Sequence, residues 1–331
     1  MTKVLIITGP TASGKSRLAL DLAEIYPIEI ISADSMQVYR HMDIGTDKAT
    51  VEERAAVRHH LIDIKDPGQP WSVEEFQQKA RRAIDDIVSR GNLPCIVGGT
   101  GFYIRALLCD FPLEDAPPDP EFRRKMNQLA KVKGNQAIYE MLKDFDLESY
   151  QALHPNDVKR VIRAIEYYQA TNRPISARKH QAKCSIYDAM MVGLQWKRQE
   201  LYERIDNRVD EQFRRGLVDE VAGLINMGYS GELPSMQGIG YKEVYWMLKG
   251  LTTEAETKAV LKRNTRRFAK RQFTWFAKEE GIIWLPFGKH TSWTNLINQV
   301  RNLVDNWLLA NTCNTSKKAC DMPEDNWREL T

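Results

Sequence analysis

The sequence predicts an α/β protein: an open parallel sheet with helices on both faces and an all-helical insertion domain. Three observations predict this fold. Short apolar runs rich in β-branched residues alternate with helical stretches over the first hundred residues. The first of these runs ends in a glycine-rich turn. A charged helical stretch then separates the early strands from a later one, which indicates an insertion.

The elements follow from local pattern. A short buried run bounded by turn residues is typical of a parallel strand, and apolar residues three or four apart predict an amphipathic helix. Pro27 should stop the first helix. The expected elements, in order, are strand Lys3–Thr8, helix Lys15–Ile25, strand Glu29–Ser32, helix Val73–Arg90, strand Leu93–Val97, strand Met190–Leu194 and strand Gly281–Phe287.

The domain boundaries follow changes in composition. Leu113–Pro120 is acidic and proline-rich, as a linker would be. We expect a core formed by residues 1–115 and 186–310, a helical insertion over 116–185, and a polar, mobile tail over 311–331.

Bulk composition excludes two classes of protein. The 331 residues carry a net charge of +3 and five scattered cysteines, a pattern that argues against a disulfide framework and for a reducing compartment. We expect no secretory leader, and the sequence has no run of about 20 apolar residues that could span a bilayer. We therefore expect a soluble cytoplasmic protein without a membrane partner, and a monomer.

The glycine-rich turn matches G-x-x-x-x-G-K-[ST] between a strand and a helix, which predicts a P-loop NTPase-like core. Its backbone N–H groups and the helix N-terminus would bind phosphate. Lys15 would neutralise the terminal phosphate, and the Ser16 hydroxyl would reach Mg²⁺. The predicted phosphate-binding residues are Gly9, Pro10, Thr11, Ala12, Ser13, Gly14, Lys15 and Ser16.

Polar residues follow three strands at Gly9–Ser16, Ala33–Tyr39 and Gly98–Gly101, and all three should face one cleft. Asp34 would lie near a bound phosphate and suits metal binding or general-base work, the alternative being a helix N-cap. Thr100 offers a hydroxyl between glycines, the alternative being a plain turn residue.

Positive charge gathers in three places. Arg204 and Arg208 share a helix face and could clamp an anion, or could pair with Glu203 or Asp210. Lys258–Lys278 holds no acidic residue, and its stripe of Arg263, Arg267 and Arg271 is typical of a nucleic-acid contact, although many such runs are solvated faces. The insertion adds further basic residues at Lys159, Arg160, Arg163, Arg173, Arg178, Lys179 and Lys183.

Seven motifs together resemble the bacterial tRNA dimethylallyltransferases, a family of tRNA prenyltransferases, over about Val4–Trp284. In chain order they are GPTASGKS, SADSMQVYRHMDIGTDK, HHLIDIKDP, GGTGFY, HPNDVKRVIRAIE, QGIGYKE and TRRFAKRQFTW.

The resemblance implies transfer of a dimethylallyl group from dimethylallyl diphosphate to N6 of adenosine 37 of tRNA, next to the anticodon, with Mg²⁺. It implies that Thr11–Ser16 bind the diphosphate, that Asp34 is the general base, that Thr100 lies at the reacting centre and that Arg208 contacts the diphosphate. The insertion would close on the anticodon stem-loop. The implied tRNA contacts are Asp34, Ser35, Met36, Gln37, Thr100, Arg123, Lys159, Arg160, Val161, Ile162, Arg163, Gln237, Gly238, Ile239, Gly240, Tyr241, Lys242, Arg271, Gln272, Phe273, Thr274, Trp275, Phe276, Ala277 and Lys278.

Three other functions stay open at this point. A P-loop small-molecule kinase using ATP and an AMP-directed prenyltransferase leave the basic segments unexplained, and an RNA-binding regulator leaves the phosphate loop idle. Within the tRNA prenyltransferase reading, Gln37 could read a base edge, and Tyr39 or Phe102 could stack on a base.

Overall fold

The computed structural model describes residues 1–109, 116–177 and 185–310. The predicted tail over 311–331 and the basic residues Arg178, Lys179 and Lys183 lie outside these ranges. The chain divides into two compact units, the first formed by Met1–Trp71, Lys79–Ile104 and Tyr187–Thr331, the second by Ser72–Gln78 and Arg105–Ile186. The stretch predicted as a helical insertion falls within the second unit.

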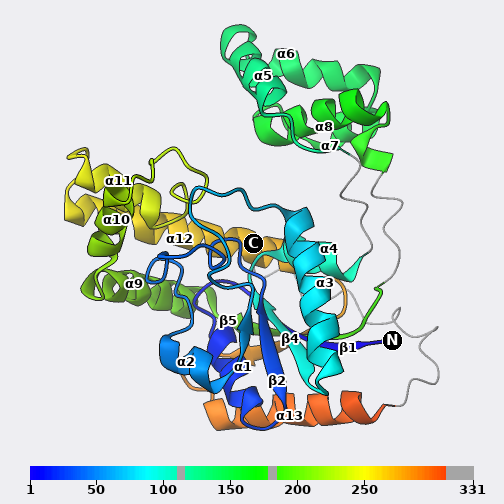
Figure 1. The fold of residues 1–331 in the computed structure, drawn as a ribbon, viewed down its shortest axis with the longest axis vertical. Coiled ribbons are helices and arrows are strands. Elements are labelled where there is room, and N and C mark those ends of the chain that lie inside the picture. The colour runs from blue at the N-terminus through cyan, green and yellow to red at the C-terminus, as the bar shows by residue number, and fades with distance from the viewer. Residues whose placement is uncertain (110–115, 178–184, 311–331) are drawn as a thin grey trace. The chain divides into compact units, whose positions relative to one another are not determined.

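The first unit is built on a six-stranded sheet in the order β3-β2-β4-β1-β5-β6, and every neighbouring pair is parallel (Figure 1). This confirms the predicted open parallel sheet. The strands are β1 Lys3–Thr8, β2 Ile28–Ser32, β3 His59–His60, β4 Leu93–Gly98, β5 Asp188–Trp196 and β6 Ile282–Phe287. Because β1 lies between β4 and β5, the loop that follows β1 is at the centre of the carboxyl edge.

Helices cover the sheet because successive side chains of a buried strand point to opposite faces. Leu5 and Ile7 of β1 pack in one cluster with residues of α1 (Lys15–Ala23) and α13 (Trp293–Leu309). Val4 and Ile6 alternate with them and are also fully buried. The remaining helices before α5 are α2 Val51–Ala56, α3 Val73–Ser89 and α4 Gly101–Leu108.

Four later helices form a second layer of the first unit, and Figure 1 shows them gathered on one side of the sheet. Their apolar core joins Val209, Leu217, Tyr241 and Leu261, one from each helix. The helices are α9 Arg198–Arg214, α10 Leu217–Asn226, α11 Tyr241–Leu248 and α12 Glu254–Phe276. Thr253 starts α12 with a capping box to Glu256.

The second unit is helical around a core that includes Ile138, Leu142 and Ile165. Its elements are α5 Pro120–Lys133, α6 Asn135–Glu140, the 3₁₀ turn η1 Met141–Asp144, α7 Leu147–Ala152 and α8 Val158–Thr171. In the part of the chain that the structure describes, no helix has the length and apolarity needed to cross a membrane.

Candidate functional site

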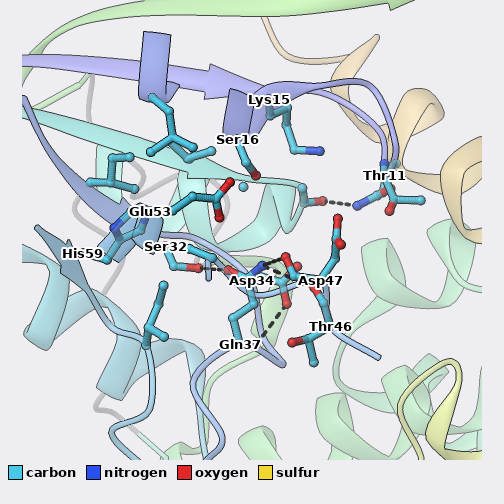
Figure 2. A pocket seen from close by; sticks show the side chains of 18 of the residues that line it. Thr11, Lys15, Ser16, Ser32, Asp34, Gln37, Thr46, Asp47, Glu53 and His59 are labelled. Carbon is cyan, nitrogen blue, oxygen red and sulfur yellow. Dashed lines mark hydrogen bonds between the residues drawn. The ribbon is translucent and has the colours of Figure 1, made fainter. Parts of the chain in front are cut away.

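The three predicted strand ends converge on one cavity at the carboxyl edge of the sheet. Residues of the phosphate loop, of the β2 exit and of the β4 exit all line it, as Figure 2 shows for Lys15, Ser16 and Asp34. We call this the phosphate-loop cavity. Its full lining also includes Leu20, Ile30, Ile62 and Val97, which make one part of the wall apolar beside the polar one.

Lys15 is the loop's main cation. Its ammonium donates to the Pro10 carbonyl at 2.7 Å. Burial and the nearby charge of Arg208 lower the pKa of Lys15 from 10.5 to about 8, although Asp34 and Asp47 act in the opposite direction. An anion bound in the loop would favour the charged form of Lys15.

Gln272 of α12 holds the phosphate loop through side-chain hydrogen bonds. Its side-chain oxygen accepts from the Thr11 N–H at 2.8 Å, and its amide nitrogen donates to the Gly99 carbonyl at 2.9 Å. A Cβ at Gly99 would lie 2.2 Å from that nitrogen, so glycine is required for this approach. Gln272 is 7% exposed and supports the phosphate loop through these two bonds, and the tRNA contact that the resemblance implies for it stays a prediction.

The two arginines of α9 face the phosphate loop and pair with neither Glu203 nor Asp210. Arg204 donates to the Ala12 carbonyl at 2.9 Å, and its guanidinium lies over the Trp196 ring. Arg208 donates to the Thr11 hydroxyl at 3.1 Å and lies 3.3 Å from a carboxylate oxygen of Asp47. The anion clamp is therefore the interpretation that the geometry favours for Arg208.

Asp34 uses one carboxylate oxygen locally and presents the other to the cavity. Its Oδ1 accepts from the backbone N–H of Met36 at 2.8 Å and of Gln37 at 3.4 Å. This is a turn-stabilising contact and no helix follows it, so the helix N-cap alternative is wrong. No hydrogen bond to Oδ2 is recorded among the described residues, and that oxygen is available to accept a proton.

A second cavity opens beside the first. Thr11, Asp34, Thr46, Arg208 and Phe268 line both cavities, so the two meet at these side chains. The wall of the second cavity also contains Thr100 and residues from three predicted tRNA-contacting segments, namely Ser35, Met36, Gln237, Gly238, Ile239, Tyr241 and Arg271. We call it the base-side cavity.

The basic stripe of α12 is divided between two faces. Lys258, Lys262 and Arg266 form ion pairs with Glu254, Asp210 and Asp206 respectively. The exposed cations of the other face have no recorded ion pair among the described residues; they are Arg263, Arg267, Lys270, Arg271 and Lys278. The lack of acidic residues in Lys258–Lys278 therefore suggests more unpaired cations than the structure has. The acidic partners lie outside this segment, on α9 and in the first turn of α12.

Several predicted contact residues have buried side chains. Tyr39 is 4% exposed, so the prediction that it stacks on a base is wrong, whereas Phe102 is 42% exposed and lies edge-on to Trp275. The predicted tRNA contacts with buried side chains, apart from Gln272, are Val161 at 0%, Ile162 at 3%, Tyr241 at 1% and Phe276 at 1%.

Two predicted contacts of the helical unit share one carboxylate. Arg123 binds both oxygens of Glu166, which is only 3% exposed, and Arg163 binds the same group. The backbone N–H of Asp119 donates to it as well. Lys159 and Arg160 are exposed on the same helix as Arg163.

Sequence reasoning missed Asp47. It lines the phosphate-loop cavity, pairs with Arg208 and adopts a left-handed backbone with φ of 51°. Nothing in its spacing marks it as part of the site, since it lies 13 residues after Asp34 in a loop.

Comparisons with known proteins agree with this geometry. A model of the IPP transferase family matches residues 37–279, and a model of isopentenyl transferases matches residues 2–66. The chain is 46% identical over 286 residues to a tRNA dimethylallyltransferase of Thermoanaerobacter sp., with 85% of this chain and 91% of that protein covered.

Solved structures give the same result. A tRNA isopentenylpyrophosphate transferase from Bacillus halodurans is 41% identical, with a TM-score of 0.71 over 93% of this chain and 97% of that one. A eukaryotic dimethylallyltransferase that acts on tRNA is 28% identical, with a TM-score of 0.77 over 96% of this chain and 82% of that one. With a family match over most of its length and a phosphate loop opening onto a second, base-side cavity, the chain belongs to the IPP transferase family.

Proposed function

We propose that this protein transfers a dimethylallyl group from dimethylallyl diphosphate to N6 of adenosine 37 in tRNA, beside the anticodon. The observation that carries the proposal is the meeting of the two cavities at Thr11, Asp34 and Arg208. A phosphate-binding loop lies on one side of these residues and predicted RNA-contacting segments lie on the other. The names of relatives, such as tRNA dimethylallyltransferase, support prenyl transfer to tRNA.

The diphosphate is the leaving group in this reaction. The C–O bond between the dimethylallyl C1 and the diphosphate breaks, and the electron pair leaves with the diphosphate oxygen. Lys15, Arg208 and the loop N–H groups stabilise the negative charge that develops there. The apolar wall of the phosphate-loop cavity, which includes Leu20, Ile30 and Val97, suits the hydrocarbon end of the donor.

The residues of the phosphate-loop cavity fit Mg²⁺ as the cofactor. The Ser16 hydroxyl supplies an oxygen ligand of the kind that Mg²⁺ prefers, in a cavity that the carboxylates of Asp34 and Asp47 also line. Among the described residues no group of three His, Cys, Asp or Glu side chains could enclose a metal, so substrate phosphates and water would complete the coordination. The ion would neutralise diphosphate charge.

Asp34 acts on the nucleophile. The adenine N6 forms the new bond to C1 and gives up a proton, which the free Oδ2 of Asp34 accepts. The base-side cavity, of about 300 Å³, has room for a purine base. The base must leave the anticodon stack, and exposed Phe102 offers a ring on which a loop base can stack.

Exposed cations on two helices would contact the phosphates of tRNA. Arg263, Arg267 and Arg271 face solvent along α12, and Lys159 and Arg160 face solvent on α8. A small-molecule kinase or an AMP prenyltransferase would have no use for either group. We propose that each of these groups of cations contacts tRNA.

A transfer assay tests the proposal. The protein is incubated with unmodified tRNA, labelled dimethylallyl diphosphate and Mg²⁺, and nuclease digestion then locates the label. The label should appear on the adenosine 3′ of the anticodon, with one diphosphate released per transfer. Transfer to free AMP alone, or phosphate transfer from ATP to a small molecule without prenylation, would overturn the proposal in favour of one of its rivals.

A further inference from the structure

We propose that Glu220 and Tyr241 form a positioning brace, which fixes the loop Asp43–Lys48 and, through Asp47, holds Arg208 at the diphosphate. The inference rests on the proposed function. Tyr241 lines the base-side cavity, but its hydroxyl is directed to Glu220 and not into that cavity, so both side chains would act through Asp47. We call Asp43–Lys48 the braced loop.

Glu220, in the first turn of α10, binds the braced loop through its backbone. One carboxylate oxygen accepts from the N–H groups of Asp43 at 2.9 Å and Ile44 at 2.7 Å. The other accepts from the N–H of Gly45 at 3.1 Å and from the Tyr241 hydroxyl at 2.7 Å. Four donors converge on one carboxylate, an arrangement that fixes three successive peptide units.

Tyr241 supplies the fourth donor from a buried position. It is 1% exposed, and its ring lies so close to Gly45 that a Cβ there would be 2.5 Å from it. Burial and the adjacent Glu220 raise the pKa of Tyr241 well above 10, so its hydroxyl keeps its proton and donates at any working pH. Tyr241 is the first residue of α11 and belongs to the segment Gln237–Lys242, which we expect to contact tRNA.

The far end of the braced loop reaches the reaction site. Gln212 donates to the carbonyls of Ile44 and Gly45, and Gln37 donates to those of Thr46 and Asp47. These contacts hold Asp47 in its left-handed conformation, which costs free energy for a residue other than glycine. The Asp47 carboxylate then lies within salt-bridge distance of Arg208 and Arg215.

Loss of the Tyr241 hydroxyl should lower the rate of the chemical step more than the affinity for tRNA. Without the Tyr241 hydroxyl the braced loop keeps its fold but loses one charge-assisted hydrogen bond. Asp47 then confines Arg208 less tightly, and a misplaced guanidinium stabilises the departing diphosphate less well. The exposed surface of Gln237–Lys242 is unchanged.

The decisive comparison is Tyr241→Phe against Tyr245→Phe. Tyr245 lies on the same helix, and its hydroxyl has no recorded hydrogen bond within the described part of the chain. Its change to Phe therefore removes the same atom without affecting the brace. We expect Tyr241→Phe to lower kcat about tenfold, in line with the loss of a charged hydrogen bond, with the KM for tRNA within twofold of wild type. Tyr245→Phe should match wild type in both constants.

A second cycle tests the route through Asp47. In an Asp47→Asn background the Tyr241→Phe change should cost less than twofold in kcat, because the brace no longer has a charge to position. A general loss of stability would cost the same in both backgrounds. Glu220→Gln should lower kcat at least as much as Tyr241→Phe, and the double variant should be no worse than Glu220→Gln alone.

Different failures of these experiments have different meanings. If wild type transfers no prenyl group to tRNA, the proposed function fails. If wild type is active and Tyr241→Phe equals Tyr245→Phe, the brace is overturned while the function stands. A full tenfold loss in the Asp47→Asn background would likewise overturn the route through Asp47.

Discussion

The phosphate-loop cavity and the exposed face of α12 both gather positive charge, but they use it in opposite ways. Burial and then the charge of Arg208 lower the pKa of Lys15, and Arg208 has fixed partners in Thr11 and Asp47. Arg263 and Arg267 on α12 are exposed and have no recorded ion pair among the described residues. Enclosed charges with fixed geometry stabilise one charge distribution, whereas free surface charges contribute affinity that salt can screen.

The largest expected effect follows from removing the base in the cavity. Asp34→Asn keeps an oxygen that can accept from the Met36 N–H, so the turn should survive. The amide cannot take a proton from N6, and kcat should fall about 10²–10⁴-fold with tRNA affinity unchanged. Single-turnover kinetics and a filter-binding assay measure the two quantities.

Asp219→Asn is the matched control, because Asp219 is an exposed carboxylate of α10 with no recorded partner among the described residues. It should behave as wild type. Near-normal turnover of Asp34→Asn would remove Asp34 from the role of general base.

A smaller effect is expected from neutralising the free face of α12. Changing Arg263, Arg267 and Arg271 to Gln should weaken tRNA binding at least tenfold. The slope of log affinity against log salt should fall by about 2–3, since each phosphate contact contributes about 0.7–0.9. Binding titrations over a range of salt concentrations give both numbers.

The paired face of the same helix provides the control. Changing Lys258, Lys262 and Arg266 to Gln removes the same net charge, but these cations are already paired with Glu254, Asp210 and Asp206. The salt slope should change by less than one. Equal slopes for the two triple variants would mean that the free face has no special part in binding tRNA.

The smallest effect concerns the protonation of Lys15. Its pKa of about 8 leaves the lysine largely charged at pH 7 and largely neutral at pH 9. A bound diphosphate favours the charged form, so affinity should fall as pH rises above 8, by at most tenfold per pH unit.

Calorimetry with an unreactive thio analogue of the donor can measure this, because the last ionisation of its terminal phosphate lies near pH 6. Binding at pH 9 should take up protons in wild type and take up none in Lys15→Arg, whose guanidinium stays charged. Proton uptake of zero in wild type would contradict the lowered pKa.

The first strand, the phosphate loop and the cavity at the strand ends could be predicted from the sequence, because each depends on a local pattern of residues. The apolar run Lys3–Thr8 predicts a strand, and the glycine-rich turn that follows it predicts a phosphate loop. The strand β1 has the predicted bounds. The convergence of Gly9–Ser16, Asp34 and Gly98 on one cavity follows from the rule that ligands bind at the carboxyl ends of parallel strands.

The rest depends on contacts between distant segments. Gln272 lies on a basic helix, yet it turns inward to the phosphate loop because Gly99 leaves room for it. Tyr39 follows a polar strand exit, yet it packs in the core beside Val38 and Met42. The partners of Lys262 and Arg266 come from α9, more than 50 residues earlier, so no local pattern could show that these charges are paired.

The most direct test is a crystal structure of the protein with the unreactive donor analogue and an anticodon stem-loop. Our account predicts the diphosphate against Lys15 and the N–H groups of Thr11–Ser16, and the extruded adenine in the base-side cavity. Its N6 should lie about 3 Å from the Asp34 carboxylate. An N6 atom beyond hydrogen-bond reach of Asp34, or an analogue bound away from Lys15, would contradict the claim that the two substrates meet at Asp34.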